Sequence, residues 1–497
     1  MRERLKKAPT GELIKYIIEP AIKKDLKQSY YNLLEVNKSH LVMLVEQELI
    51  SREDSRIILT VIRNMELKGS GVIEIDPELE DLYFNIESHI NQQTGIEIGG
   101  QLHTGRSRND IYATITRLNS RDCLVKLCTL VNHLRSVILQ IAKDNLYVIM
   151  PGYTHSQPAE PITFAHYLSG ILHAIERDYE RLENVFYRLN QSPLGSGAMA
   201  STTFNINRQQ TAYWLGFDSV MNNSLDGIAS RDYILEILSS LNIFMVNLSR
   251  FCHDLYTWST DEFSYIEVDD SVAVCSSIMP QKKNPITLEH VKAKAAHLQG
   301  AFVSAISSLK NISYTHSRES SMESLRFYWD ALNEIEIAVE VLVPTLKTLK
   351  VNHNLMLSRT KANFSTVTEL ANMLVREERV SFRTAHQIVA NVVMEVHEKS
   401  LNAEYIDYGM VAKAFLEKTG KSISITEELI SKALDPITNV NSRDTIGGPA
   451  PEEVVLQLEK IEKHLLMDSN KLAIYEEKIG NSKFDLNEKI NQILSTH

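Results

Sequence analysis

The sequence predicts an all-α protein built from long helices. Only 19 of its 497 residues are glycine and 13 are proline, a low content that favours uninterrupted helices over sheets with many turns. Neither residue occurs between Ile111 and Met150, and no glycine occurs between Gly227 and Gly300. Because a chain of this length is too long for one simple core, we expect three helical domains around a central bundle of long helices.

The composition argues against several classes of function. The chain carries 52 Lys and Arg against 63 Asp and Glu, a formal net charge of −11, so nothing indicates a nucleic-acid partner. It shows no signal peptide and no run of about 18 apolar residues, so we expect a soluble, cytoplasmic protein with no membrane partner. The four cysteines form no CxxC pair and no metal-like group with histidine, so we expect a reducing compartment and no metal site. No nucleotide or flavin motif is visible, so we expect no cofactor. The four cysteines are Cys123, Cys128, Cys252 and Cys275.

Residues 1–105 are predicted to form an N-terminal helical domain. From Gly11 to Gly71 the pattern is helical and highly charged, and no group of residues in it indicates chemistry. The stretch EDLYFNIE, which starts at Glu80, is typical of an amphipathic helix with acidic residues on the outside. The candidate inward positions of this domain are Leu33, Leu34, His40, Leu41, Leu44 and Val45.

A turn followed by a long helix is predicted at the start of the central bundle, which we assign to residues 106–364. The segment GGQLHTGRSRND combines flexible glycines with two arginines, one of them Arg108, and with Asn109. Arginines at a helix start interact unfavourably with the helix dipole, which lowers stability. This cost is reasonable if their guanidinium groups bind an anion there. The ordinary alternative is that Asn109 or Asp110 caps the helix and the arginines are solvated.

The irregular segment PGYTHSQPAEP, which starts at Pro151, separates long helical stretches. Within it, His155 is the only side chain whose unperturbed pKa allows proton transfer near neutral pH. A lone histidine in a loop is more often an ordinary hydrogen-bonding residue. Another long buried helix is predicted between Ile228 and Trp258, where apolar residues recur with helical spacing. They are Ile234, Leu238, Leu241, Met245, Leu248, Cys252 and Leu255.

The segment CSSIMPQKKNP, residues 275–285, brings hydroxyls, two lysines and an amide together. Pro280 and Pro285 fix φ and disfavour helix just before them, so we expect a loop. A helix should follow over residues 286–309, with Asn284 as its N-cap and proline as its first residue. An oxyanion at this helix start would gain from backbone N–H groups, the dipole and the lysines. The ordinary alternative is a capped, solvated helix start.

A smaller all-helical C-terminal domain is predicted over residues 365–497. Pro344 should interrupt the helical stretch before it. From Ile461 onward the sequence indicates a charged helical tail, and neither a repeat nor a low-complexity segment is visible.

Together these motifs resemble those of the fumarase and aspartase superfamily, and most closely those of the argininosuccinate lyases. SSIMPQKKNP is similar to the superfamily's signature loop, HTGRSRND matches the lyase motif residue for residue, and PGYTHSQ stands where these lyases have PGYTHxQ. The resemblance covers about residues 75–455. It implies a homotetramer in which the central bundles associate and each active site is shared by three subunits.

Several positions depart from the lyase pattern. Cys275 stands where the family has glycine, which tolerates a positive φ that a side chain resists. Ile286 replaces an aspartate, and Tyr83 replaces the histidine of the motif EDxHxxxE. In the segment YNxDxQxxK, Glu319 replaces the glutamine and Met322 replaces the lysine. The last two changes should weaken binding of a second carboxylate and favour a positive group in the amine half of the substrate.

The resemblance implies anti elimination of fumarate from an N-substituted aspartate. Ser276 would remove the proton next to the carboxylate, and Lys282, nearby N–H groups and the helix start would lower its pKa. Lys282 and Asn284 would hold the resulting dianion. His155, or a water that it orients, would protonate the leaving nitrogen, and the two proton roles can also be exchanged. The substrate would be bound by Arg108, Asn109, Thr154, Tyr314 and Glu319.

Three functions remain open at this point. The chain could be an argininosuccinate lyase of arginine biosynthesis, which releases arginine and fumarate, or a sister carbon–nitrogen lyase that uses another amine. Glu319 and Met322 favour the second of these. A non-catalytic role like that of related lens crystallins is disfavoured, because His155, Ser276 and Lys282 are intact. The sequence does not fix the identity of the amine.

Overall fold

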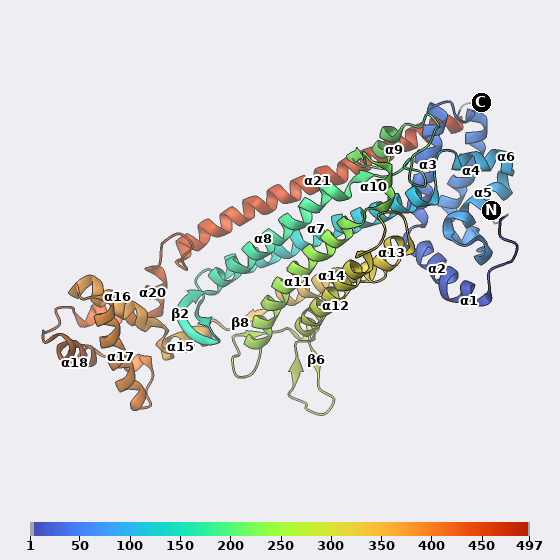
Figure 1. Ribbon diagram of the computed structural model, residues 1–497. Helices are drawn as coiled ribbons and strands as arrows, with labels where there is room; N and C mark the ends of the chain where they lie inside the picture. Colours follow the sequence, from blue (N-terminus) through green and yellow to red (C-terminus); the bar gives the residue numbers. More distant parts are fainter. Residues whose placement is uncertain (1–3, 496–497) are drawn as a thin grey trace.

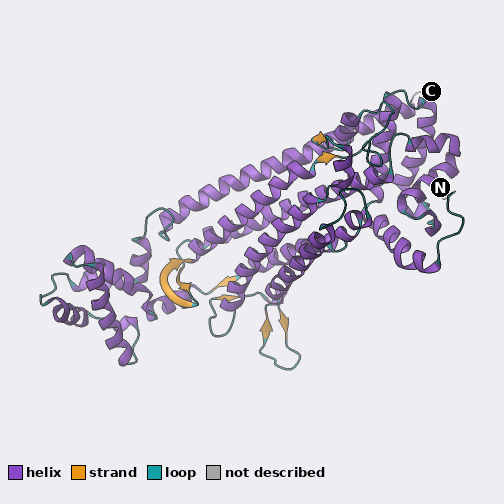
Figure 2. Cartoon of the chain, viewed as in Figure 1, coloured by secondary structure: helices purple, strands orange, loops and turns teal. Residues whose placement is uncertain are grey.

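The computed structural model describes residues 4–495. Figure 1 shows an elongated chain with a bundle of long helices in the middle, one helical unit at the N-terminal end of the bundle and a smaller unit at the other end. Helices dominate, and the strands are short (Figure 2). The predicted all-α fold is therefore confirmed.

The N-terminal unit is a cluster of short and medium helices around its own apolar core. The predicted inward residues from Leu33 to Val45 are buried in it, as is His40. Its elements are α1 (Gly11–Leu13), a π-helical turn (Ile14–Ile18), α2 (Glu19–Gln28), α3 (Tyr30–Glu46), α4 (Arg52–Lys68), 3-10 turns (Ser70–Val72 and Pro77–Leu79), α5 (Leu82–Thr94), α6 (Ile96–Gly99) and a 3-10 turn (Gly100–His103).

The central bundle is built on long helices that share one apolar core. Ser107 caps the first of them and Asp110 completes a capping box, so neither Asn109 nor Asp110 is the cap. Pro344 lies inside the last turn of α14, where one missing hydrogen bond does not end the helix. The helices are α7 (Arg108–Asp144), α8 (Phe164–Leu189), α9 (Arg208–Trp214), α10 (Ser224–Ala229), α11 (Asp232–Trp258), α12 (Ile286–Leu309), α13 (Arg318–Ser321) and α14 (Tyr328–Lys347), with 3-10 turns at Asp270–Val272 and Glu323–Leu325.

Within the described residues, four two-stranded sheets connect these helices. Three pairs are antiparallel, β1 with β2, β5 with β8 and β6 with β7, and β3 pairs with β4 in parallel. The strands are β1 (Ile149–Thr154), β2 (Gln157–Thr163), β3 (Gln191–Ser192), β4 (Ser219–Val220), β5 (Ile266–Glu267), β6 (Val274–Cys275), β7 (Lys283–Asn284) and β8 (Lys350–Val351). Two of the antiparallel hairpins, β1–β2 and β6–β7, carry residues that we predicted to be catalytic.

The small unit at the far end of the bundle has a third apolar core. Its elements are α15 (His353–Ala362), a 3-10 turn (Phe364–Thr366), α16 (Val367–Glu378), α17 (Phe382–Glu398), a 3-10 turn (Ala403–Tyr405), α18 (Tyr408–Thr419), α19 (Glu427–Leu434) and α20 (Pro436–Asn441). The expected C-terminal domain therefore has its structural counterpart in the first part of residues 365–497.

The final helix, α21 (Pro451–Ser495), does not belong to the small unit. It runs back along α7 and α8 and reaches the N-terminal unit (Figure 1). Its apolar residues are shared between two cores, Leu458 and Ile461 in the bundle and Leu486 and Ile490 in the N-terminal unit. The predicted charged tail is thus a helix with one buried apolar stripe, which packs on the bundle and on the N-terminal unit.

Two helices, α7 and α11, each contain an 18-residue window that is long and apolar enough to cross a membrane. The windows are 56% and 50% buried inside the single chain, and α7 also buries the charged side chains of Arg117, Arg121 and Arg135. Apolar helices of this kind are equally typical of a bundle core. We interpret both as core helices.

Candidate active site

The predicted site residues lie in three separate places within one chain. Arg108 starts α7 beside the N-terminal unit, and His155 lies at the far end of the bundle, in the β1–β2 hairpin (Figure 1). The 37 residues of α7 put about 55 Å between these ends, at about 1.5 Å per helical residue. Ser276, Lys282 and Asn284 lie in the β6–β7 hairpin, which projects from the bundle.

The β6–β7 hairpin surrounds the Ser276 hydroxyl with backbone donors. Ser276 Oγ accepts hydrogen bonds from the N–H groups of Ile278 (3.3 Å) and Met279 (3.1 Å), and its own N–H donates to the Lys282 carbonyl at 3.2 Å. The Lys282 ammonium donates to Asn284 Oδ1. Donors aimed at an oxygen stabilise its anionic form, so the hairpin has the groups that a serine base needs.

The two lysines of the hairpin have different surroundings. The ammonium of Lys283 pairs with Asp270 at 2.6 Å and with Glu267 at 3.1 Å, and its hydrogen bond to Asp270 raises its pKa. Lys282 instead faces the amide of Asn284. Lys283 is thus held in ion pairs, and the role predicted for Lys282 stays a prediction.

The start of α12 differs from the prediction. Asn284 pairs with Val274 in the β6–β7 sheet and is extended, and Pro285 takes the N-cap position without a side-chain cap among residues 4–495. Asn284 as N-cap was therefore wrong, because strand pairing fixes its backbone. Cys275 lies in the extended strand β6, so a cysteine in place of glycine introduces no positive φ.

The β1–β2 hairpin presents His155 at its tip. Thr154 pairs with Gln157, which leaves His155 and Ser156 as a two-residue turn with φ of 54° and 59°. Such positive values at two consecutive residues are typical of the turn that fits a twisted hairpin. Each positive φ value costs about 1 kcal/mol or more for a residue other than glycine, and strain of this kind is concentrated at functional sites.

A cavity of about 660 Å³ lies behind this hairpin. Thr154 lines it together with Tyr153, His166, Asp254 and Trp258. Glu160 of the hairpin also lines this cavity, and it forms an ion pair with Arg443, 2.8 Å long. Thr154 thus lies at the edge of a space large enough for a small molecule.

At the other end of the bundle, α5 holds Arg108. The Arg108 guanidinium donates to Asp81 at 2.7 Å and to Glu80 at 3.4 Å, and it lies over the Phe84 ring at 4.1 Å. Glu80 and Asp81 are therefore partners of the predicted anion-binding arginine and not simply outer residues of an amphipathic helix. The EDxHxxxE resemblance was the only signal for this role. Asn109 donates to the Ala198 carbonyl at 3.0 Å.

The residues predicted to contact the amine half lie at the same end. Tyr314 is exposed and its hydroxyl donates to Asp226, a hydrogen bond that raises the pKa of Tyr314 to about 12. Glu319 lies on α13, and burial together with Arg231 and Arg108 lowers the pKa of the neighbouring His316 to about 4. The His316 imidazole is therefore neutral near pH 7 and lies within reach of the charge of Arg108.

A further carboxyl group contacts this cluster from α2. Burial and the nearby Asp81 raise the pKa of Asp25 to about 7, although Lys24 and a hydrogen bond from Tyr112 act in the opposite direction. The ordinary pKa of an aspartate is about 3.9. The folded chain therefore favours the protonated form, and stability is lost as the pH rises from about 4 through 7.

Replacing Asp25 with asparagine should remove this loss. At pH 8 we expect the free energy of unfolding of Asp25→Asn to exceed that of the wild type by a few kcal/mol, at about 1.4 kcal/mol per pKa unit. The melting temperature of the variant should be higher accordingly. At pH 3.5, below the unfolded pKa, the advantage should almost disappear. Calorimetric scans at both values measure this, and an equal difference at the two pH values would contradict the proposed protonation.

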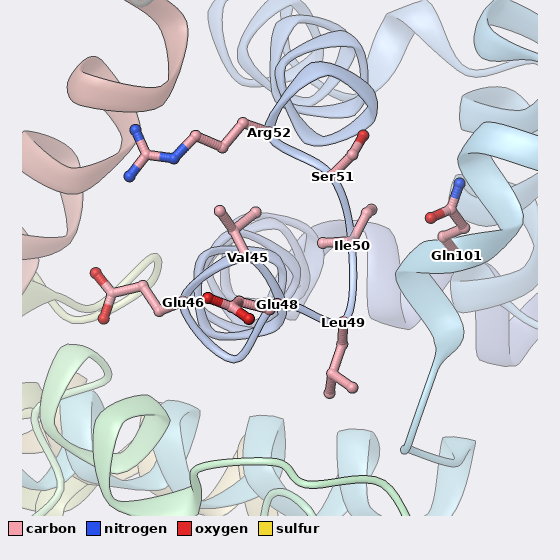
Figure 3. A pocket seen from close by; sticks show the side chains of 8 residues that line it. All are labelled: Val45, Glu46, Glu48, Leu49, Ile50, Ser51, Arg52 and Gln101. Atoms are coloured by element: carbon pink, nitrogen blue, oxygen red, sulfur yellow. The ribbon is translucent and has the colours of Figure 1, made fainter.

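Figure 3 shows a different cavity, of about 730 Å³, on the N-terminal unit. Glu46, Arg52 and Gln101 are among its lining residues, and none of the predicted site residues is. Glu46 pairs with Lys489 of α21 at 2.7 Å, a structural contact. Among residues 4–495, no three His, Cys, Asp or Glu side chains lie close enough together to hold a metal ion.

Comparison with known proteins assigns the chain to a family. A family described as Lyase matches residues 34–300, and one described as Argininosuccinate lyase C-terminal matches residues 364–441. Argininosuccinate lyase 1 of Shouchella clausii is 52% identical over 470 residues, which cover 95% of this chain and 94% of the relative. The chain belongs to the argininosuccinate lyase family.

Other members of the argininosuccinate lyase family support this assignment. The argininosuccinate lyase of Methanocaldococcus jannaschii is 39% identical and covers 92% of both chains. Among solved structures, an EDDS lyase in complex with formate is 32% identical, with a TM-score of 0.88 over 99% of this chain and 97% of the other. The 470 matched residues also extend beyond residues 75–455, so the similarity is wider than the motifs indicated.

Proposed function

We propose that the chain is a carbon–nitrogen lyase that cleaves argininosuccinate into arginine and fumarate by β-elimination. The observation that carries this proposal is the β6–β7 hairpin, in which backbone N–H groups converge on Ser276 and the ammonium of Lys282 faces Asn284. In this proposal Ser276 removes the proton, Lys282 and Asn284 hold the dianion, and His155 protonates the leaving nitrogen. The name of the 52% identical relative supports the choice of substrate.

We further propose that four copies assemble and that three of them contribute to each site, in the cytoplasm. Support comes from the separation of Arg108, His155 and Ser276 within one chain. It also comes from α12, on which Val303 and Ile306 are exposed in the single chain, since apolar residues around a whole helix indicate burial on all sides. Association of α11 and α12 between copies would cover them.

The function is tested with the ultraviolet absorbance of fumarate. Purified protein and argininosuccinate should produce fumarate at an enzymatic rate, and fumarate with arginine should react in reverse. If argininosuccinate gives no fumarate while fumarate is consumed with another amine, the enzyme class would stand and the proposed substrate would fall.

A second candidate is a sister lyase with another amine partner. It is favoured by Glu319 and Met322, which put a carboxylate and a thioether where the family resemblance has an amide and an ammonium. A neighbour in structure is named an EDDS lyase, and a variant of it was solved with bound fumarate. A panel of amines tested with fumarate distinguishes the two candidates.

Removing Arg108 should weaken substrate binding. In Arg108→Ala the guanidinium that faces the predicted carboxylate site is lost, and charge-assisted hydrogen bonds are worth about 1.5–3 kcal/mol. We expect KM to rise by about 10-fold to 100-fold. Steady-state kinetics measure this, and Arg63→Ala, at an exposed position of α4, is the control. An unchanged KM would remove Arg108 from the site.

A further inference from the structure

Helix α5 contacts the HTGRSRND turn at two points, on either side of its glycine. After the glycine, Asp81 and Phe84 hold Arg108. Before it, the hydroxyl of Tyr83 lies 2.5 Å from Nδ1 of His103. Tyr83 is only 1% exposed, so this second contact is buried inside the N-terminal unit.

The turn between these contacts leaves little room for a side chain at Gly105. Gly105 has φ of +75°, and a Cβ at this position would lie 3.1 Å from the Ile206 side chain. The Thr104 carbonyl is bound by His40 Nε2 at 2.8 Å, so His40 is protonated on that nitrogen. The backbone on the N-terminal side of the turn is therefore fixed by side chains, and its C-terminal side leads directly to Arg108.

Arg106, between these points, is a buried cation beside the Tyr83–His103 pair. Arg106 is 6% exposed and its guanidinium carbon lies 5.6 Å from the Tyr83 ring centre, and none of its nitrogens has a well-aligned hydrogen-bond partner among residues 4–495. Burial and this positive charge lower the pKa of His103 to about 4. Because His103 is neutral, its Nδ1 can accept a hydrogen bond from the Tyr83 hydroxyl.

We infer that Tyr83 is a positioning residue for substrate binding: its hydrogen bond to His103 fixes the turn that places Arg108. This inference rests on the proposed function, because it requires that Arg108 binds the substrate carboxylate. Tyr83 stands where the family resemblance has histidine, so the tyrosine–histidine pair is a feature of this chain. A displacement of about 1 Å at a positioning group is enough to lower activity strongly.

The test is Tyr83→Phe, which keeps the ring and removes only the hydroxyl. We expect KM to rise about 5-fold to 10-fold, as for one lost buried hydrogen bond, with kcat changed less than 2-fold. Tyr30→Phe is the matched control, because Tyr30 is also buried in the N-terminal unit and its hydroxyl donates to the Met65 carbonyl at 3.0 Å. This control should leave KM unchanged.

A double-mutant cycle separates positioning from general stability. If Tyr83 acts through Arg108, Tyr83→Phe should have no further effect on KM in the Arg108→Ala background, so the two effects are non-additive. Additive effects, or a KM change equal to that of Tyr30→Phe, would overturn the inference. If Arg108→Ala itself leaves KM unchanged, the proposed role of Arg108 falls, and this inference falls with it.

Discussion

Ser276→Ala should nearly abolish turnover while the protein stays folded and assembled. The alanine removes the hydroxyl that accepts hydrogen bonds from the N–H groups of Ile278 and Met279, and loss of a positioned general base costs about 10²–10⁴-fold in rate. We expect kcat to fall by about 10³-fold and KM to change little, because the side chain reacts and does not anchor the substrate. The measurement is fumarate release at saturating substrate.

The matched control for this result is Ser277→Ala. Ser277 is the next residue of the same exposed hairpin, so the control tests whether any loss of a hydroxyl in the hairpin is harmful. It should retain most of the activity. A folded and fully active Ser276→Ala protein would exclude Ser276 as the base.

Two inactive variants should restore each other when their subunits are mixed. His155→Asn and Ser276→Ala each leave no intact site. If a site takes these residues from different subunits of a closed assembly, about one site in four of a random equal mixture has both, so activity should return to about a quarter of the wild-type value. Co-expression, or refolding the two variants together, followed by the fumarate assay measures this.

A pair of variants on one hairpin provides the control for mixing. Ser276 and Lys282 lie on the same hairpin and interact through their backbones, so they enter every site from one subunit. A mixture of Ser276→Ala with Lys282→Met should therefore remain inactive. Equal recovery in both mixtures, or recovery in neither, would contradict a site shared between subunits.

The sequence predicted the long helices correctly because their cores repeat with helical spacing over many turns. The helices expected at residues 228–258 and 286–309 are present as α11 and α12. The sequence predicted the ends of the helices less well. Asn284 has the composition of a cap, but its pairing with Val274 depends on a hairpin that local propensity does not describe.

Motifs in the sequence predicted the candidate site residues, but they did not predict the partners of these residues. HTGRSRND pointed to Arg108 as a candidate, while the carboxylate of Asp81 comes from the N-cap of α5, 27 positions earlier in the chain. The choice of Lys282 over Lys283 likewise depends on Asp270. These contacts form only after helices pack, so spacing along the chain does not contain them.

The path of α21 has a consequence for how the protein is made. Its residues Leu486, Ile490 and Ile493 complete the core of the N-terminal unit, which a ribosome synthesises first. At roughly 5–20 residues per second, that unit waits roughly 20–80 s for its last apolar contacts. Nascent chains should therefore expose this core to chaperones throughout translation, and loss of the final turns should damage the opposite end of the polypeptide.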